Sequence, residues 1–491
     1  MKTTTGTSGT TSARKRTRGS TFLIAAATLA FAASVGCDGD DTADDDDGAS
    51  ASGGSSGKGG SAGKGGSSGK GGTSGKGGGA GSAGKGGTTS EGGSGGEAGD
   101  DAGGAPSSGA AGWAGGGGYA GDDDGASGSG GAAEGGAGNE LDPMQVFRHD
   151  TFGNEQFWTD QLRLHEFIQA SLDPMTALSV GLKVDADVLP EGILDTVDLE
   201  DPATTVALLE LGAVVGVEGR VEDGNLVSVG ITCALCHSNV DDSVMEGIGS
   251  RIDGPANRDL DPGLIISLAP GLADNQAARD VYASWGKGRF DPRYNQDGIN
   301  APVLIPPIYG LDGVPLETYT GDGPVSYWNS YVAVTQMGGQ GVFFDSRIGV
   351  QVFQEPDLVT SKLPALFEYE TSLLAPAPPA ASFDAAAAAR GQVLFAGAAQ
   401  CSTCHSGEHF TDAADTLHAP EETGMDPVSA ERSATGNYRT TPLRALFDHP
   451  PYFHDGSAAT LPEVVTHYVT ALSLTLTEPE QADLVEYLKS L

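Results

Sequence analysis

The chain has 491 residues, of which 76 are glycine, and its formal net charge is −39 at pH 7. Such an acidic balance gives no electrostatic reason to bind nucleic acid or anionic lipid headgroups, so we expect no nucleic-acid partner. The length allows two or three domains, although the glycine-rich N-terminal part does not have the composition of a folded domain.

The first 37 residues have the features of a bacterial export signal. "ARKRTRGS" is positively charged, and the apolar run "TFLIAAATLAFAASVG" has sixteen residues, whereas a membrane span needs about 20. The following "SVGC" resembles a lipobox, in which the cysteine is lipidated; a plain signal peptide with an incidental cysteine is the alternative. We therefore expect residues 1–37 to be a lipoprotein-type signal peptide. The mature protein would lie in the periplasm or at the cell surface, anchored to the membrane only through a lipid on Cys37.

Residues 38–141 have no pattern that would form a core. The acidic run "DGDDTADDDD" is followed by the hexads "SSGKGG", "SAGKGG", "SSGKGG" and "TSGKGG" and then by looser Gly/Ser/Ala sequence. Such a composition cannot bury enough apolar surface to fold. We expect a disordered linker, whose roughly 100 residues would span about 50–60 Å as a flexible coil.

Aromatic residues begin after this linker, and residues 142–374 are expected to form the first folded domain. Within "FWTDQLRLHEFIQASL" the apolar residues have helical spacing. They are Phe157, Leu162, Leu164, Ile168 and Leu172. The text that follows is mixed, with short apolar runs broken by Gly, Pro and Asp, which predicts long loops.

Residues 375–382, with "APAPPAA", have the composition of an interdomain linker, and residues 383–491 are expected to form the second domain. "FDAAAAARGQVLF" predicts a helix starting near Asp384. The chain ends in "LTEPEQADLVEYLKSL", where Thr477 and Glu480 have the spacing of a capping box. The apolar stripe of that last helix would be Leu484, Val485, Leu488 and Leu491.

Two C-x-x-C-H pentads, "CALCH" and "CSTCH", carry the clearest chemistry in the sequence. This pattern attaches c-type haem: both cysteines form thioethers to the porphyrin, and the adjacent histidine is the proximal iron ligand. A structural zinc site would need four ligands from cysteine pairs that here lie 168 residues apart, and a thioredoxin-like motif would need a βαβ setting. We therefore predict two covalent c-type haems. The attachment residues are Cys233, Cys236, Cys401 and Cys404, and the proximal ligands are His237 and His405.

Three stretches near the C-terminus carry a family resemblance: "LFAGAAQCSTCHSGEHFTD", "YRTTPLRALFDHPPYFHDGSAATLPEVVTHY" and "LTEPEQADLVEYLKSL". They resemble the C-terminal domain of the bacterial di-haem cytochrome c peroxidase superfamily, which includes the MauG-type enzymes. The resemblance covers roughly residues 383–491. It implies a mainly α fold, with two cytochrome c-like haem domains after the signal peptide and the Gly/Ser-rich linker. It also implies a reactive N-terminal haem, a C-terminal haem that passes electrons to it, and a calcium ion between the domains. Arg444 and His454 lie in the matching motifs and are expected near the haem.

The sixth iron ligand decides what each haem can do. MauG-type proteins have a tyrosine where Tyr468 stands, so the resemblance makes Tyr468 the candidate ligand of the His405 haem; His467 and Met425 are the alternatives. For the His237 haem the candidates are Met337, His165 and His149, or an open position. The segment after the first pentad departs from the family pattern and retains only "DGPANRDL".

Two functions therefore stay open. In the first, the chain is a di-haem peroxidase-type oxidoreductase that reduces hydrogen peroxide or oxidises a partner protein. In the second, it is a surface-tethered cytochrome that passes electrons between redox partner proteins without a substrate of its own. Trp285 and Trp328 are interpreted as core residues, with a position between the haems as the alternative.

Overall fold

The computed structural model describes residues 141–491. The expected signal peptide with Cys37 and, apart from Leu141, the expected linker of residues 38–141 lie outside this range. No helix in the described range is long and apolar enough to cross a membrane.

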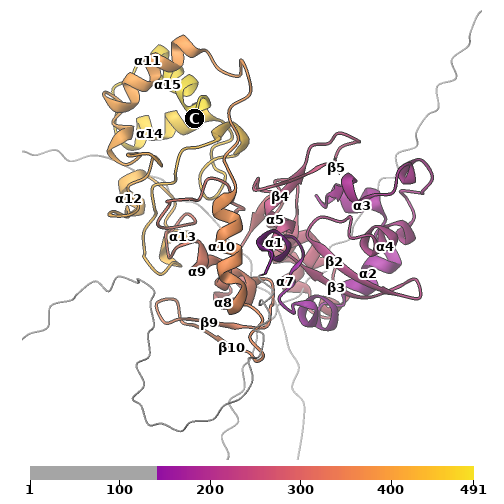
Figure 1. Cartoon of the computed structure of the whole chain (residues 1–491). Helices are drawn as coiled ribbons and strands as arrows, with labels where there is room; N and C mark the ends of the chain where they lie inside the picture. Colours follow the sequence, from indigo (N-terminus) through magenta and orange to yellow (C-terminus); the bar gives the residue numbers. More distant parts are fainter. Residues whose placement is uncertain (1–140) are drawn as a thin grey trace, which may run out of the picture. The chain divides into compact units, whose positions relative to one another are not determined.

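Helices dominate the described residues, at about 40% helix against 12% strand, which confirms the mainly α prediction at the level of secondary structure. Figure 1 shows their arrangement along the chain. The α-helices are α1 (Pro143–His149), α2 (Leu164–Ser171), α3 (Pro174–Ser179), α4 (Pro202–Glu210), α5 (Ala234–His237), α6 (Pro262–Ser267), α7 (Gln276–Ala283), α8 (Tyr294–Asp297), α9 (Val325–Tyr331), α10 (Leu363–Ser372), α11 (Ala385–Ala396), α12 (Pro420–Thr423), α13 (Val428–Glu431), α14 (Leu461–Ala471) and α15 (Glu478–Lys489). Shorter 3₁₀ and π turns are η1 (Gln156–Gln161), η2 (Ala186–Val188), η3 (Ile193–Asp195), η4 (Pro270–Leu272), η5 (Val332–Gln336), η6 (Thr360–Lys362), η7 (Cys401–Thr403) and η8 (Leu446–Asp448).

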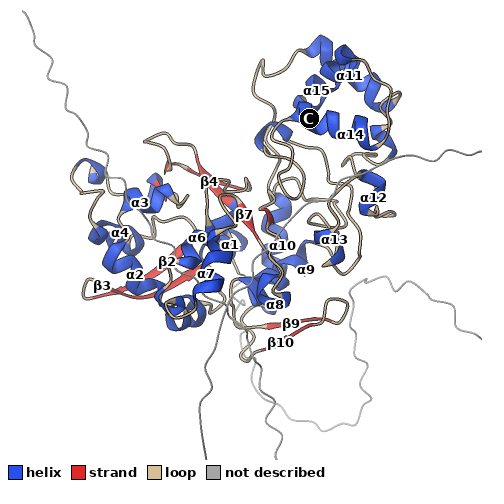
Figure 2. Ribbon diagram, turned by 180° about the vertical axis from the view of Figure 1, so that it is seen from behind, coloured by secondary structure: helices blue, strands red, loops and turns tan. Residues whose placement is uncertain are grey.

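The strands of the described range all precede α10 and pair two by two, as Figure 2 shows in red. The pairs are β2 (Val217–Glu222) with β3 (Asn225–Ile231), β4 (Ser238–Val240) with β6 (Arg251–Asp253), β7 (Arg289–Phe290) with β8 (Val303–Leu304) and β9 (Val342–Asp345) with β10 (Val350–Phe353), all antiparallel, and β1 (Val184–Asp185) with β5 (Ile248–Gly249), parallel. The sequence analysis did not predict these strands. The β2–β3 turn did carry a sequence signal, the Asp223–Gly224 pair. Both residues have the positive φ that a tight hairpin requires.

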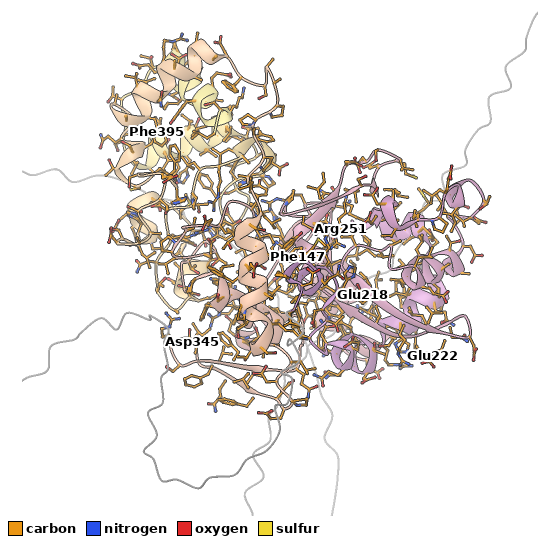
Figure 3. The ribbon with its side chains drawn as sticks, viewed as in Figure 1. Phe147, Glu218, Glu222, Arg251, Asp345 and Phe395 are labelled. Atoms are coloured by element: carbon orange, nitrogen blue, oxygen red, sulfur yellow. The ribbon has the colours of Figure 1, made fainter. Side chains whose placement is uncertain are left out.

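Three apolar clusters form the core of residues 141–491, and each pentad lies against at least one of them. Cys236 packs against the first cluster, which includes Ile168, Leu209 and Val229. Cys233 packs against the second, built on α1, α9 and α10. Cys401 packs against the third, built mainly from α11, α14 and α15. Phe147 of the second cluster and Phe395 of the third are labelled in Figure 3. The first pentad is thus held between two clusters.

The helix predicted around residues 157–172 is interrupted in the structure. The π turn η1 ends at Gln161, Arg163 takes a left-handed conformation with φ of 59°, and α2 then begins at Leu164. The interruption lets the Leu162 carbonyl accept a hydrogen bond from Gly271 N at 2.8 Å. Four of the five predicted apolar positions, Leu162, Leu164, Ile168 and Leu172, are nevertheless buried in the core, and the fifth, Phe157, is partly buried and packs against it.

The two C-terminal helices form where the sequence predicts them. Asp384 caps α11 by accepting hydrogen bonds from Ala386 N and Ala387 N. Thr477 and Glu480 form the expected capping box of α15. The two helices cross closely at Gly391, where a Cβ atom would lie 2.0 Å from the Asp483 carbonyl oxygen, so only glycine fits.

Between Ser372 and Ala385 there is no helix or strand, and the role of residues 375–382 as an interdomain linker stays a prediction. Trp285 is 2% exposed and meets Tyr282, Phe290 and Tyr294 edge to face, so its interpretation as a core residue is confirmed.

Candidate haem sites

The second pentad follows α11 directly. Gln400 has a left-handed conformation with φ of 56°, and the pentad begins directly after it with the short turn η7, which starts at Cys401. His405 Nδ1 lies 3.1 Å from the Phe410 carbonyl oxygen. Because a carbonyl only accepts, Nδ1 carries the proton in this hydrogen bond. In the neutral ring Nε2 then has a lone pair that can bind a metal. Burial lowers the pKa of His405, which favours the neutral ring. An imidazole oriented in this way suits an iron ligand.

A cavity of about 510 Å³ lies at this pentad. Its volume is in the range of pockets that enclose organic ligands, and most of its wall is apolar, from residues such as Leu443, Val465 and Leu484. The cavity brings together seven residues singled out from the sequence, namely Cys401, Cys404, His405, Met425, Arg444, His454 and Tyr468.

Three arginines also line the cavity, namely Arg258, Arg439 and Arg444. Several of their nitrogens are buried and make no hydrogen bond: Nε and Nη1 of Arg258, and Nε of Arg439. Burial lowers the pKa of Arg444 to about 10. Glu317 pairs with Arg439 at 3.1 Å, yet its own Oε1 has no partner. Buried guanidinium groups without partners are costly unless an anionic ligand completes them.

A haem fits this cavity on two counts. The apolar wall suits the porphyrin, and the unpaired guanidinium N–H groups suit the two propionates, because arginine binds carboxylates through paired hydrogen bonds. The residues present therefore match the group that the pentad predicts.

The candidate sixth ligands of this site occupy different positions. Tyr468 is partly buried in the cavity wall, and desolvation, followed by Cys401 and Cys404, raises its pKa. His467 Nε2 lies 2.8 Å from the Thr423 carbonyl oxygen, so this nitrogen is already engaged. Tyr468 and Met425 remain available, and the choice between them stays a prediction.

His454 is 5% exposed and lies 3.1 Å from the Tyr438 hydroxyl, which agrees with a structural role at the cavity wall. The sequence analysis missed two further histidines of this wall, His418 and His449. The "FDHPPYF" context of His449 mixes aromatic residues with prolines and gives no periodic signal.

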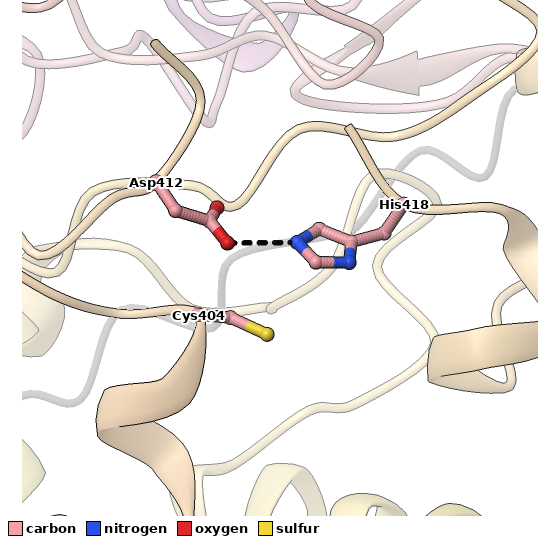
Figure 4. A group of neighbouring side chains, drawn as sticks. All are labelled: Cys404, Asp412 and His418. Atoms are coloured by element: carbon pink, nitrogen blue, oxygen red, sulfur yellow. Dashed lines mark hydrogen bonds and ion pairs between the residues drawn. The ribbon is translucent and has the colours of Figure 1, made fainter. Parts of the chain in front are cut away.

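Figure 4 shows Cys404, Asp412 and His418, whose ligand atoms lie within 4.8 Å of one another. His418 Nε2 is 3.0 Å from Asp412 Oδ2, and its Nδ1 is 3.1 Å from Glu422. Within residues 141–491 this is the only such group of potential metal ligands. Calcium prefers six to eight oxygen ligands, which this mixed set does not offer. The expected calcium ion therefore stays a prediction without a located site.

The first pentad is held far more tightly. It follows strand β3, and Gly216 lies so close behind it that a Cβ atom would be 2.0 Å from Leu235 N. Burial lowers the pKa of His237 to about 4. Its Nδ1 is buried and makes no hydrogen bond. The backbone of Pro306 partly offsets the effect of burial by raising the pKa of the ring. A neutral, partly unsatisfied imidazole of this kind also suits an iron ligand.

A buried carboxyl group near this pentad was not foreseen from the sequence. Glu370 on α10 is 3% exposed, and its Oε2 accepts a hydrogen bond of 2.7 Å from Asn329 Nδ2. Burial raises its pKa to about 8. The pKa of Cys233 is raised by burial and next by the charge of Glu370. The helix that carries Glu370 also contributes Leu366 to the apolar cluster against which Cys233 packs. One signal existed: Glu370 stands four residues after the buried Leu366, on the apolar face of the helix.

The candidate sixth ligands of the His237 iron are less clearly placed. Met337 is 5% exposed in the cluster against which Cys233 packs, and its carbonyl accepts from Trp158 Nε1. His165 on α2 has a buried Nδ1 without a partner. His149 Nδ1 lies 2.7 Å from Glu218 Oε1 at the surface. Among the described residues no hydrogen bond joins any of these three to His237, so the sixth ligand stays a prediction.

Trp328 on α9 donates through Nε1 to the Glu317 carbonyl at 3.1 Å, and the next residue, Asn329, holds Glu370. Trp328 therefore contacts Glu317 of the second cavity and precedes Asn329, the partner of Glu370, in the sequence. It also packs against the second apolar cluster, as a core residue would.

No protein-family model matches the chain. The methylamine utilization protein MauG of Methylorubrum extorquens is 35% identical over 125 residues, which are 21% of this chain and 34% of MauG. Cytochrome-c peroxidase IdrP1 of Denitromonas iodatirespirans is 30% identical over 151 residues, 22% of this chain and 40% of that protein. The chain thus spans little more than a third of the length of these relatives.

Two solved structures show a weak likeness. Hydrazine synthase of Kuenenia stuttgartiensis has a TM-score of 0.31 and 21% identity, covering 45% of this chain and 82% of that one. A MauG-like protein associated with microbial copper homeostasis has a TM-score of 0.28 and 20% identity, covering 40% and 75%. The sequence matches show that the chain is related to the superfamily of MauG and the di-haem cytochrome c peroxidases.

Proposed function

We propose that the chain is a di-haem c-type cytochrome that works as a peroxidase-type oxidoreductase, reducing hydrogen peroxide or oxidising a partner protein. The observation that carries this proposal is the cavity at His405, whose apolar wall and unpaired arginine nitrogens match a haem. Covalently bound haem supplies one-electron redox chemistry. The relationship to MauG and cytochrome-c peroxidase IdrP1 supports the same class of activity.

At the second site the protein holds and orients the relay haem. Cys401 and Cys404 attach it, and the Phe410 carbonyl fixes the ring of His405. Tyr468, or Met425 in its place, would fill the sixth position. A filled position favours electron transfer over reaction with peroxide.

At the first site Cys233, Cys236 and His237 hold the reactive haem, and Glu370 handles protons. Reduction of hydrogen peroxide breaks its O–O bond and consumes two electrons and two protons to give two molecules of water. The electrons come from the reduced partner protein. Glu370, protonated at neutral pH and held by Asn329, is a buried carboxyl group near this pentad that can give and regain a proton.

The protein would act outside the cytoplasm, in the periplasm or at the cell surface, with a lipid on Cys37 as its only membrane anchor. Attachment of c-type haem takes place in the same compartment, which supports this location. The acidic chain would meet its redox partner through a basic surface of that partner.

Low-temperature EPR of the haem-loaded protein tests the proposal, oxidised and half-reduced, with and without hydrogen peroxide. We expect a high-spin ferric signal that peroxide abolishes and that a His237→Gly variant lacks. Two low-spin signals that peroxide leaves unchanged would overturn the peroxidase function and leave a tethered electron carrier.

The ligand of the second site is tested by Tyr468→Phe, with Met425→Leu as the matched variant from the same cavity wall. We expect Tyr468→Phe alone to change the EPR spectrum of the His405 haem. The opposite result, a change in Met425→Leu alone, would assign the sixth position to Met425.

A further inference from the structure

The segment "DGPANRDL", residues 253–260, folds back onto the first pentad. Gly254 N donates to the His237 carbonyl at 2.8 Å, and Asn257 N donates to the Cys236 carbonyl at 2.9 Å. Asn257 is 2% exposed, and its side-chain amide donates to the Gly181 carbonyl at 2.8 Å. These bonds fix the backbone of the next residue, Arg258, beside the first site.

The side chain of Arg258 reaches the other site. It lines the cavity that contains Cys401, Cys404 and His405. Its Nε and Nη1 atoms are buried and have no hydrogen-bond partner. The carboxylate of Asp448 lies within electrostatic reach, but its Oδ2 accepts the Tyr309 hydroxyl at 3.2 Å.

Arg258 joins the two sites through its backbone and its side chain. Its neighbour Asn257 is hydrogen-bonded to Cys236 of the first pentad, whereas the side chain of Arg258 lies in the wall of the second cavity. Arg444 lines the same cavity but belongs to the segment that follows the second pentad. The two arginines thus share the cavity and reach it from different parts of the chain.

We propose that Arg258 is a positioning residue shared by the two haem sites, binding a propionate of the His405 haem through Nε and Nη1 from a backbone fixed to the first pentad. One guanidinium group then sets the electrostatic environment of both haems. The inference rests on the proposed function, because it requires a haem at each pentad.

Potentiometric titration of the haem-loaded full chain, followed optically and by EPR to separate the two haems, tests the inference. A fixed positive charge favours the reduced iron, which carries less positive charge. Arg258→Gln should therefore lower both reduction potentials. We expect a change of about tenfold in the reduction equilibrium at the His405 haem, or about 59 mV for a one-electron couple. At the His237 haem we expect about threefold.

Arg444→Gln is the matched control, since it removes a guanidinium group from the same cavity wall. It should lower the potential of the His405 haem and leave that of the His237 haem unchanged. Arg258→Lys should largely restore the potential of the His237 haem, because it keeps the charge. Arg258→Met, with a stem of similar shape, gives the same test if the Gln variant does not fold.

The outcomes separate the inference from the function on which it rests. Haem bound at both pentads with only the His405 potential lowered by Arg258→Gln would overturn the shared role. No shift at either haem would overturn it as well, while the two haems would still support the proposed function. Haem staining and mass measurement that find no haem at either pentad would overturn the function itself.

Discussion

The two pentads have the same sequence pattern and different surroundings. His405 is oriented by the carbonyl of Phe410, only five residues away, and stands in a wide cavity. His237 has no such partner for Nδ1, and its pentad is held by segments distant in sequence, at Gly216 and Asn257. The first site also has a buried carboxyl group nearby, Glu370. The ring of His405 is therefore oriented by a local contact, whereas the first pentad depends on long-range packing, which also brings a buried carboxyl group to it.

The largest effect should come from removing one cysteine pair at a time. Cys401→Ala/Cys404→Ala and Cys233→Ala/Cys236→Ala should each reduce the haem content from two to one, because each pair attaches its own haem. Mass spectrometry and the optical haem spectrum measure this. If either double variant lost both haems, the two sites would not be independent units, and the contrast between them would fail.

The next effect sharpens the contrast in proton handling. Glu370→Gln keeps the hydrogen bond to Asn329 possible but removes the transferable proton. We expect peroxide turnover to fall by about 10²–10³-fold with unchanged haem content, the range of a lost general acid–base group. Steady-state peroxide reduction measures it. Glu368→Gln, at an exposed position of the same helix, is the control, and an equal loss there would remove the special role of Glu370.

The sequence predicted the C-terminal region well because local rules decide it. Asp384 and Thr477 cap their helices, and the stripe with Leu484 and Leu488 is buried where helical spacing places it. Both pentads, the Tyr468 position and the motif residues Arg444 and His454 could also be named. The structure then places Tyr468, Arg444 and His454 in the wall of one cavity.

What the sequence did not predict depends on contacts between distant residues. Glu370 lies 133 residues after His237, and Arg258 belongs to a segment whose family pattern is lost, so neither could be assigned to a site by spacing. The helix around Arg163 is broken by packing against Gly271, which no local pattern encodes. The sixth ligand of the His237 iron stays open for the same reason.

Glu370 should also make stability depend on pH. Its pKa is about 8 in the folded protein, against an ordinary value of 4.5. Between these values the folded state keeps a proton that the unfolded state releases, so the free energy of unfolding falls as pH rises. The slope from this group is about 1.4 kcal/mol per pH unit. Denaturant unfolding at pH 5, 6 and 7 measures this. We expect the free energy of unfolding of the wild type to fall, relative to that of Glu370→Gln, as the pH rises. Parallel curves would mean that Glu370 ionises normally and is not desolvated.

The smallest effect concerns the helix that walls the second cavity. Thr477→Ala removes the side-chain half of the capping box at the start of α15, and loss of such a cap costs about 1 kcal/mol. Because the cap is lost, amide hydrogen exchange should become faster in α15, whose Leu484 and Leu488 line the cavity. Exchange around the first site should stay unchanged. Thr475→Ala, at an exposed position just before the helix, is the control. Faster exchange around His237 in Thr477→Ala would contradict the expected independence of the two sites, because a change at one helix end would then reach the long-range packing that holds the first.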